Sequence, residues 1–268
     1  MRLVYETVAG ASGRHPAGRA IRLVCRQCGL SSKSAKKAIN QLVATGWLRF
    51  VEDCGVSCLE KNFSGEHRLS SRVCVDISWA RPKDHSRKAG RVYLRPGSAF
   101  GDCRHPTTRL CIRALDHVLA TYGDARGLAT ALDVGTGSGI LAITAARLGM
   151  SRVVALDIDA CARKEARENV AANSLSDRIS VSARAPAEIK EIFSLVIANL
   201  RPPTLNRYAA LLSEKTAARG VLVMSGMRPD ETQQVVSAYQ QWFECVRRDQ
   251  AEGWGALVFL KNSGSSYI

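Results

Sequence analysis

The sequence predicts an α/β protein with a mostly parallel sheet, preceded by a small basic α+β domain. Three observations support this prediction. Apolar runs of strand length alternate with helical patterns between residues 108 and 241. A glycine-rich turn at residues 135–139 joins one such strand to its helix. Residues 1–95 carry 18 lysines and arginines against seven acids, whereas residues 96–268 carry 20 against 17.

The first 80 residues are predicted to form a winged helix-turn-helix domain. Helical patterns cover residues 3–9, 20–28 and 34–45, and two short strands follow at 47–52 and 58–62. The third helix has an apolar face and an opposite polar face formed by Lys33, Lys36, Lys37 and Asn40. Such a domain contacts nucleic acid, docks a protein or serves a structural purpose, and the sequence leaves these three uses open.

Residues 81–93 are predicted to be an exposed linker, because they are polar and basic and contain Pro82 and Gly90. Residues 94–268 follow as the second domain. Its predicted helices cover residues 108–122, 139–148, 160–173, 203–215 and 230–241. Its predicted strands cover residues 131–134, 153–156, 179–183, 194–198 and 220–225, and a hairpin is predicted over 243–261. Strands that alternate with helices in this way form a parallel sheet with right-handed crossovers.

The glycine-rich turn predicts a cofactor site. Asp133 lies in the strand, and Gly135, Gly137 and Gly139 follow at alternate positions. Glycines there let the backbone turn sharply and let a ligand approach closely. The spacing differs from the G-x-G-x-x-G of dinucleotide sites. Asp157 ends the next strand, about twenty residues later, where a carboxylate accepts hydrogen bonds from ribose hydroxyls. Together these features predict a nucleoside cofactor without a pyrophosphate, which S-adenosylmethionine (SAM) fits best.

Two pairs of cysteines are candidate metal ligands. The chain has nine cysteines, and the pairs Cys25/Cys28 and Cys54/Cys58 have the close spacing that zinc or an iron–sulfur cluster uses. The first pair falls inside an amphipathic helical pattern, where cysteine packs as a small apolar residue. No metal site is therefore predicted.

No membrane association is expected. The chain has no run of 18 apolar residues, which argues against a transmembrane helix. Early basic residues, among them Arg14 and Arg19, interrupt any signal-peptide core. A cytoplasmic location is the expectation.

Three passages of the second domain resemble the PrmA family of class I SAM methyltransferases, which methylate amino groups of a ribosomal stalk protein. Residues 94–109, LRPGSAFGDCRHPTTR, are similar to the family's AFG-x-x-x-HPTT segment. Residues 132–143, LDVGTGSGILAI, are followed by ALDID and by ARENVAANS, and residues 195–200 are LVIANL. The resemblance covers residues 94–260. It implies a Rossmann-like class I methyltransferase fold, SAM as the cofactor, and a lysine or terminal amino group of a protein as the substrate.

The resemblance also implies roles around the cofactor. Gly135, Gly137 and Gly139 line the methionine part of SAM, and Asp133 organises the backbone N–H groups of their loop. Asp157 binds the ribose hydroxyls and Ile158 packs beside the adenine.

Other roles concern the mouth of the site and the reaction. Phe100 and His105 shape the entrance, Thr107 and Thr108 touch the cofactor, and Asn199 faces the transferred methyl group. Methyl transfer from a sulfonium needs proximity and a neutral nucleophile, and the Asn199 amide oxygen is expected to hold the substrate nitrogen.

Departures from the family pattern keep two alternatives open. The family has a glycine- and threonine-rich loop where this chain has Asp102, Cys103 and Arg104, and a basic domain replaces the family's small α/β recognition domain. One alternative is a nucleic-acid methyltransferase that uses the winged helix to bind RNA or DNA. The other is a transcription regulator that senses SAM.

Overall fold

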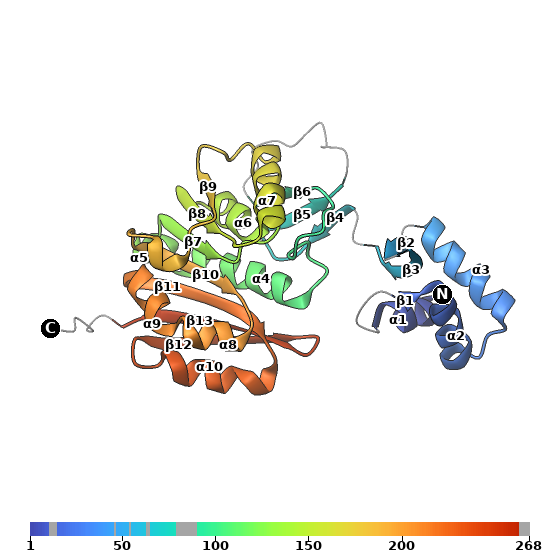
Figure 1. Ribbon diagram of the computed structural model, residues 1–268. Helices are drawn as coiled ribbons and strands as arrows, with labels where there is room; N and C mark the ends of the chain where they lie inside the picture. The colour runs from blue at the N-terminus through green and yellow to red at the C-terminus, as the bar shows by residue number, and fades with distance from the viewer. Residues whose placement is uncertain (11–14, 46, 54, 63–64, 79–89, 263–268) are drawn as a thin grey trace. The chain divides into compact units, whose positions relative to one another are not determined.

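The computed structural model describes residues 1–268 except 11–14, 46, 54, 63–64, 79–89 and 263–268. The chain divides into two compact units, Met1–Ser64 and Gly65–Ile268 (Figure 1). No helix among the described residues is long and apolar enough to cross a membrane.

The first unit contains three helices and a small antiparallel sheet whose strand order is β1-β3-β2. Its elements in chain order are α1 (Arg2–Gly10), β1 (His15–Pro16), α2 (Ala17–Cys28), α3 (Ser32–Ala44), β2 (Leu48–Asp53) and β3 (Val56–Lys61). The three predicted helices and two predicted strands are present, and β1 is an additional short strand.

The core of the first unit forms from one apolar face of each helix. Val24 on α2 and Ile39 on α3 pack with Leu48 and Leu59 from the sheet. Helix α3 begins at an N-cap serine, Ser31, whose side chain accepts a hydrogen bond from the Ser34 backbone N–H at 3.2 Å. The predicted polar face of α3 is exposed.

The second unit begins with a three-stranded sheet of order β4-β5-β6, in which β4 is antiparallel to β5 and β5 is parallel to β6. The strands are β4 (Gly65–Arg68), β5 (Cys74–Ile77) and β6 (Arg91–Leu94). This sheet corrects the predicted domain boundaries at residues 80 and 93. Residues 65–78 belong to the second unit, and residues 91–94 form a strand instead of the end of a linker. The remainder of the predicted linker, residues 81–89, lies outside the described residues.

The physical reason for this boundary is burial against the second unit. Val75 and Val92 are fully buried, and Tyr93 is 1% exposed. Asn173, on the C-cap of a helix in the second unit, accepts from the Tyr93 backbone N–H at 2.9 Å and donates to its carbonyl at 2.7 Å. A strand held at both backbone polar groups by a buried amide cannot act as a free linker.

The main sheet has seven strands in the order β12-β13-β11-β10-β7-β8-β9. The strands from β11 to β9 are parallel, and β13 and β12 run antiparallel at one edge. The bounds are β7 (Thr130–Val134), β8 (Arg152–Leu156), β9 (Ile179–Ser182), β10 (Phe193–Asn199), β11 (Thr216–Met227), β12 (Phe243–Ala251) and β13 (Trp254–Lys261). The predicted mostly parallel α/β architecture is confirmed.

Helices cover the main sheet in two groups (Figure 1). Helix α6 contacts both α4 and α7 on one side of the sheet. Helices α8, α9 and α10 contact one another on the other side. The helix bounds are α4 (Pro106–Thr121), α5 (Gly123–Arg126), α6 (Ile140–Arg147), α7 (Ala160–Ala172), α8 (Pro202–Arg207), α9 (Ala209–Lys215) and α10 (Thr232–Tyr239), with short 3₁₀ turns η1 (Pro186–Glu188) and η2 (Pro229–Glu231). The predicted helix 203–215 is divided at Tyr208, which caps α8 and precedes α9.

Strands buried on both faces explain the near-continuous apolar runs in the sequence. Leu132 and Val134 belong to the core cluster that includes residues of α8, α9 and α10. The alternate residues Ala131 and Asp133 are also fully buried, on the opposite face. The strand order reverses at β7, between β10 and β8, and ligands of open α/β sheets bind in the crevice at the carboxyl ends of such strands.

Candidate functional site

The glycine loop lies at the carboxyl end of β7 and enters α6. Gly135 and Gly137 have φ values of 75° and 55°, a region that favours glycine. A Cβ on Gly137 would lie 2.2 Å from the carbonyl oxygen of Phe100, so no side chain fits there. The Gly135 and Thr136 backbone N–H groups both donate to the Leu156 carbonyl, at 2.8 and 2.9 Å. The loop is therefore fixed to the end of β8.

Asp157, which follows β8, bonds directly to this loop. Its Oδ2 accepts from the Gly137 backbone N–H at 2.9 Å, and its Oδ1 accepts from the Asp159 N–H at 2.9 Å. Each carboxylate oxygen retains a second lone pair for a ligand hydroxyl. The adjacent Ile158 side chain is 91% exposed. The apolar Ile158 side chain suits the flat base of a nucleoside, and the half-buried Asp157 carboxylate suits the hydroxyls of its ribose.

Asp133 is fully buried beneath the loop. Its Oδ2 accepts from the Thr136 hydroxyl at 2.7 Å, whereas its Oδ1 has no hydrogen-bond partner among the described residues. Burial raises the pKa of the Asp133 carboxyl to about 6, and the charge of Asp157 adds to the increase. The loop N–H groups described above are bonded by Leu156 and Asp157. This corrects the expectation that Asp133 organises them.

The segment that carries Phe100 is fastened to the glycine loop. The Ser138 backbone N–H donates to the Phe100 carbonyl at 2.8 Å, and the Ser138 hydroxyl donates to the Gly101 carbonyl at 2.9 Å. Upstream, Glu165 of α7 accepts from the Ser98 and Ala99 N–H groups, both at 3.0 Å. Residues 98–101 are thus held from both sides and lie directly over the loop.

A small cavity brings together side chains that are far apart in the sequence. Its volume is about 10 Å³, and Phe100, Thr108, Gly135 and Asn199 are among the residues that line it. Thr108 is fully buried, and its hydroxyl has no hydrogen-bond partner among the described residues. Asn199 is the last residue of β10 and is half-buried. A buried hydroxyl without a partner costs free energy unless a ligand or water bonds it, so this atom points to a ligand.

The remaining predicted residues have other surroundings. Thr107 is fully buried, but its hydroxyl lies 2.8 Å from His105 Nδ1 at the start of α4 instead of lining the cavity. His105 is the N-cap residue of this helix. Gly139 is the N-cap of α6, and a Cβ there would lie 3.3 Å from Ala166, so a glycine at this position also allows close packing against α7.

Sequence patterns missed three residues, Trp254, Arg201 and Arg228, that form an aromatic and cationic rim with the predicted entrance residues Phe100 and His105. The His105 ring lies 4.4 Å from the Trp254 ring and 5.2 Å from the Phe100 ring, centroid to centroid. The Arg228 guanidinium stacks 4.0 Å from the Trp254 centroid, and that of Arg201 lies 5.5 Å away. Burial, with the positive charge of Arg109 next, lowers the pKa of His105, so its imidazole is neutral at pH 7.

The cysteine pairs form no metal site in the part of the chain that the structure describes. Cys25 and Cys28 pack against the core of the first unit, and Cys28 Sγ lies 3.6 Å from the Thr7 hydroxyl. Cys58 is buried in β3, and Cys54 lies outside the described residues. No group of three histidines, cysteines or acids occurs there with metal-binding geometry.

Comparison with known proteins identifies the family of the chain. The sequence model of the family described as ribosomal protein L11 methyltransferase (PrmA) matches residues 59–262. The ribosomal protein L11 methyltransferase of Geotalea daltonii is 40% identical over 200 residues, which cover 72% of this chain and 63% of the relative. That of Geobacter metallireducens is 41% identical over 195 residues, covering 72% and 61%.

A solved structure shows the same similarity. The crystal structure of ribosomal protein L11 methylase from Lactobacillus delbrueckii subsp. bulgaricus matches with a TM-score of 0.64 and 27% identity, over 74% of this chain and 98% of that one. The chain spans somewhat less than two thirds of the length of the curated relatives. Residues 1–58, nearly all of the first unit, lie outside the family match.

Proposed function

Because this chain belongs to the PrmA family of ribosomal protein L11 methyltransferases, we propose that it is a SAM-dependent N-methyltransferase that modifies an amino group of a protein. One observation carries the proposal. Phe100, Thr108, Gly135 and Asn199, from four separate segments, line one cavity beside a loop that Asp157 holds.

The residues present fit SAM. Gly135 lines the cavity beside the loop, Asp157 retains lone pairs for the ribose hydroxyls, and the exposed Ile158 offers an apolar surface to the adenine. The Thr108 hydroxyl supplies a further donor or acceptor. When bound, SAM supplies an electrophilic methyl group on a positively charged sulfonium.

The buried charge of Asp133 suits a cationic ligand. Its Oδ1 is buried without a partner among the described residues, beneath the loop that would receive SAM. At pH 7 and above this carboxyl is mostly ionised. A negative charge in a low-dielectric site favours a positively charged sulfonium over a neutral thioether.

Asn199 is the proposed positioning group for the substrate nitrogen. Its amide is neutral and ends β10 at the cavity, and no acidic residue lines the cavity with it. An amide oxygen aligns an N–H of the amine without trapping the amine as an ion pair. A lysine or terminal amine is mostly protonated at pH 7, so a proton passes to water before the nitrogen lone pair is available.

We propose a ribosomal protein of the L11 type as the substrate, as the relatives' names indicate for those proteins. Recognition of that substrate would involve the first unit, for which we propose a winged helix-turn-helix fold. The order of its elements and the exposed basic face of α3 support this assignment. The same basic face favours nucleic-acid contact as a second use of this unit.

The test uses methyl-tritiated SAM with the full chain and two acceptors, purified L11 and a cell lysate split between nuclease and protease treatment. Label on purified L11, and label in lysate that survives nuclease but not protease, would support the proposal. Label lost with nuclease would contradict it and favour methylation of nucleic acid. The Asn199→Ala chain serves as the control for enzymatic transfer.

A further inference from the structure

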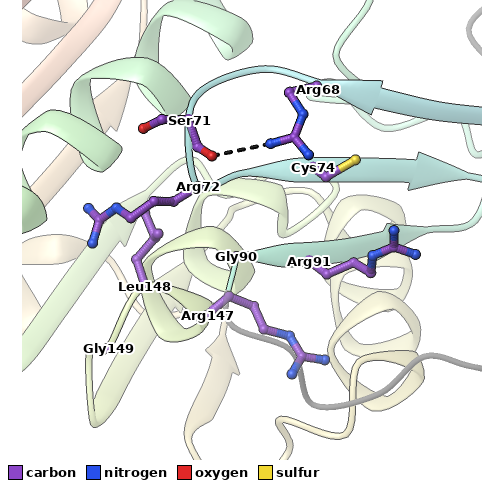
Figure 2. Close-up of a pocket in the computed structure, with 9 residues that line it drawn as sticks. All are labelled: Arg68, Ser71, Arg72, Cys74, Gly90, Arg91, Arg147, Leu148 and Gly149. Atoms are coloured by element: carbon purple, nitrogen blue, oxygen red, sulfur yellow. Dashed lines mark hydrogen bonds between the residues drawn. The ribbon is translucent and has the colours of Figure 1, made fainter.

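A second, larger cavity lies in the second unit, and four arginines are among the residues that line it. Its volume is about 510 Å³, and its nine lining residues include no acid. Figure 2 shows Arg68 from β4, Arg91 from β6 and Arg147 from the end of α6 around this space, with Arg72 beside them. We call this cavity the arginine groove.

The arginine groove is separate from the proposed methyl-transfer site. The glycine loop enters α6 at its N-terminus, whereas Arg147 is the last residue of that helix. Eight helical residues span about 12 Å, so the two cavities lie at opposite ends of α6. They share no lining residue, and binding of SAM does not account for the groove.

Ion pairs hold two of the four guanidinium groups of the groove. Arg72 bonds the Asp116 carboxylate at 2.5 Å, and Arg91 bonds that of Glu66 at 3.1 Å. Arg147 donates to the Asn173 carbonyl at 2.8 Å. Arg68 donates to the Ser71 carbonyl at 3.2 Å (Figure 2) and makes no ion pair within the described ranges. The positive charge of Arg68 is therefore not offset by an ion pair with any described residue.

The thiol at the base of the groove adds no negative charge. Burial, reinforced by the neighbouring Glu66, raises the pKa of Cys74 to about 11. The neutral thiol donates to Glu66 Oε1 at 3.0 Å. The groove is therefore positive at physiological pH, and its charged side chains are arginines, whose planar forks match phosphate oxygens.

The lining favours a nucleic-acid strand over a protein partner. Among the described residues that line the groove, Leu148 and Cys74 are apolar and none is aromatic. Protein interfaces have an apolar core enriched in aromatic residues, whereas nucleic-acid interfaces are polar and positively charged. Without aromatic platforms for bases, such a groove follows the phosphodiester backbone and not the sequence.

We propose that the arginine groove binds the phosphodiester backbone of RNA. The choice of RNA rests on the proposed function, because a ribosomal protein substrate is encountered beside RNA. Three of the four arginines fall within residues 1–95, where 18 basic residues stand against seven acids. Six of the nine lining residues thus come from the part of the chain that carries most of the net positive charge.

Fluorescence anisotropy with a 5′-labelled single-stranded RNA of mixed sequence tests the proposal on the full chain. The variants are Arg68→Ala and the double variant Arg68→Ala/Arg91→Ala. The matched control is Arg207→Ala/Arg248→Ala, which removes two exposed arginines that contact a tyrosine ring and a glutamine side chain. We expect the groove double variant to raise Kd roughly tenfold and to reduce the salt slope by about 1.4, and the control to change neither comparably.

Three results would overturn the proposal. The first is that the chain fails to bind RNA at physiological salt. The second is that the groove and control variants weaken RNA binding equally. The third is that polyglutamate competes with RNA for the groove and binds more tightly than RNA does. The same sequence as DNA measures any preference for RNA, and weaker binding of RNA than of DNA would contradict that choice. Calorimetric titration with SAM on each variant keeps the two proposals distinguishable, because SAM binding must be unaffected by loss of Arg68 and Arg91.

Discussion

The Gly137 backbone N–H donates to the Asp157 carboxylate across 2.9 Å. This bond joins the glycine loop after β7 to the acidic end of β8, two segments that are twenty residues apart in the chain. The same carboxylate is the proposed partner of the ribose hydroxyls. The glycine loop therefore fixes the position of the Asp157 carboxylate. The loop and the carboxylate, which are the two halves of the proposed SAM site, are joined by a direct hydrogen bond.

Substitution of Gly137 by alanine is expected to abolish SAM binding and to lower the free energy of unfolding. The added Cβ would lie 2.2 Å from the Phe100 carbonyl oxygen at a φ of 55°, so the loop or residues 98–101 must move. Calorimetric titration with SAM and urea unfolding measure both effects. Gly123→Ala is the matched control, since nothing lies within 4 Å of its added Cβ. Equal behaviour of the two variants would contradict the packing described for the loop.

Substitution of Asp157 by alanine is expected to weaken SAM binding by at least about tenfold, because it removes both the acceptor for Gly137 and the proposed ribose ligand. Asp159→Ala removes a nearby carboxylate that caps α7 by accepting from Cys161. That variant should lose about 1 kcal/mol of unfolding free energy and retain SAM affinity. If Asp159→Ala weakened SAM binding as much as Asp157→Ala, the ribose assignment would fail.

Asp133 gives the protein a specific dependence of stability on pH. Burial raises its pKa in the folded protein to about 6 from 3.8, so the folded state binds the proton more tightly than the unfolded state. Proton binding at Asp133 therefore contributes fully to the free energy of unfolding below about pH 4, and this contribution is lost as the pH rises through 6. Asp133→Asn should gain unfolding free energy relative to wild type between pH 4 and pH 7, by up to about 3 kcal/mol.

Urea unfolding of both chains at several pH values measures this difference. The test compares how the difference in unfolding free energy between the variant and wild type changes with pH. A cost of the new amide that is the same at every pH does not affect this comparison. A constant difference from pH 4 to pH 7 would show that Asp133 titrates normally in the folded protein.

Glu165 is expected to control the order of the segment over the site. Its carboxylate accepts from the Ser98 and Ala99 N–H groups, and Glu165→Ala removes both bonds. We expect a loss of about 2 kcal/mol in unfolding free energy and faster hydrogen exchange at residues 98–101. Glu168→Ala, on the exposed face of the same helix, should change neither. Unchanged exchange at residues 98–101 in Glu165→Ala would contradict the role assigned to this carboxylate.

The parallel core could be predicted because its signals are local. Strands β7, β8 and β10 are short apolar runs that end at or just before a glycine, an acid and an amide, and each intervening helix has its own apolar pattern. The elements of the first unit could be predicted for the same reason. Its third helix has an N-cap serine and a clear division between apolar and basic residues.

Features that depend on distant contacts could not be predicted. Strands β4 and β6 are four residues long, and β6 is defined by its pairing with β5 and by Asn173, about 80 positions later. Trp254 reaches His105 across nearly 150 positions. Arg68, Arg91 and Arg147 come together from three segments. In each case the signal is a tertiary arrangement, to which no periodicity in the sequence corresponds.

Among the predicted site residues, those within one loop met expectations more closely than those assigned by resemblance alone. Gly135 and Gly137 adopt the glycine-only backbone that their spacing implied. The Thr107 backbone N–H donates to His105 Nδ1 and so caps the helix, and the Thr107 hydroxyl lies 2.8 Å from the same nitrogen instead of lining the cavity.

The measurement that tests the central claim most directly is single-turnover methyl transfer from tritiated SAM to purified L11, compared between wild type and Asn199→Ala. Asn199 ends β10 at the cavity, and its proposed role is to position the substrate nitrogen without carrying SAM affinity. We expect SAM to bind both proteins nearly equally and the transfer rate to fall by about 10² or more in the variant. Equal transfer by both proteins, or loss of SAM affinity in proportion to rate, would contradict the proposed site.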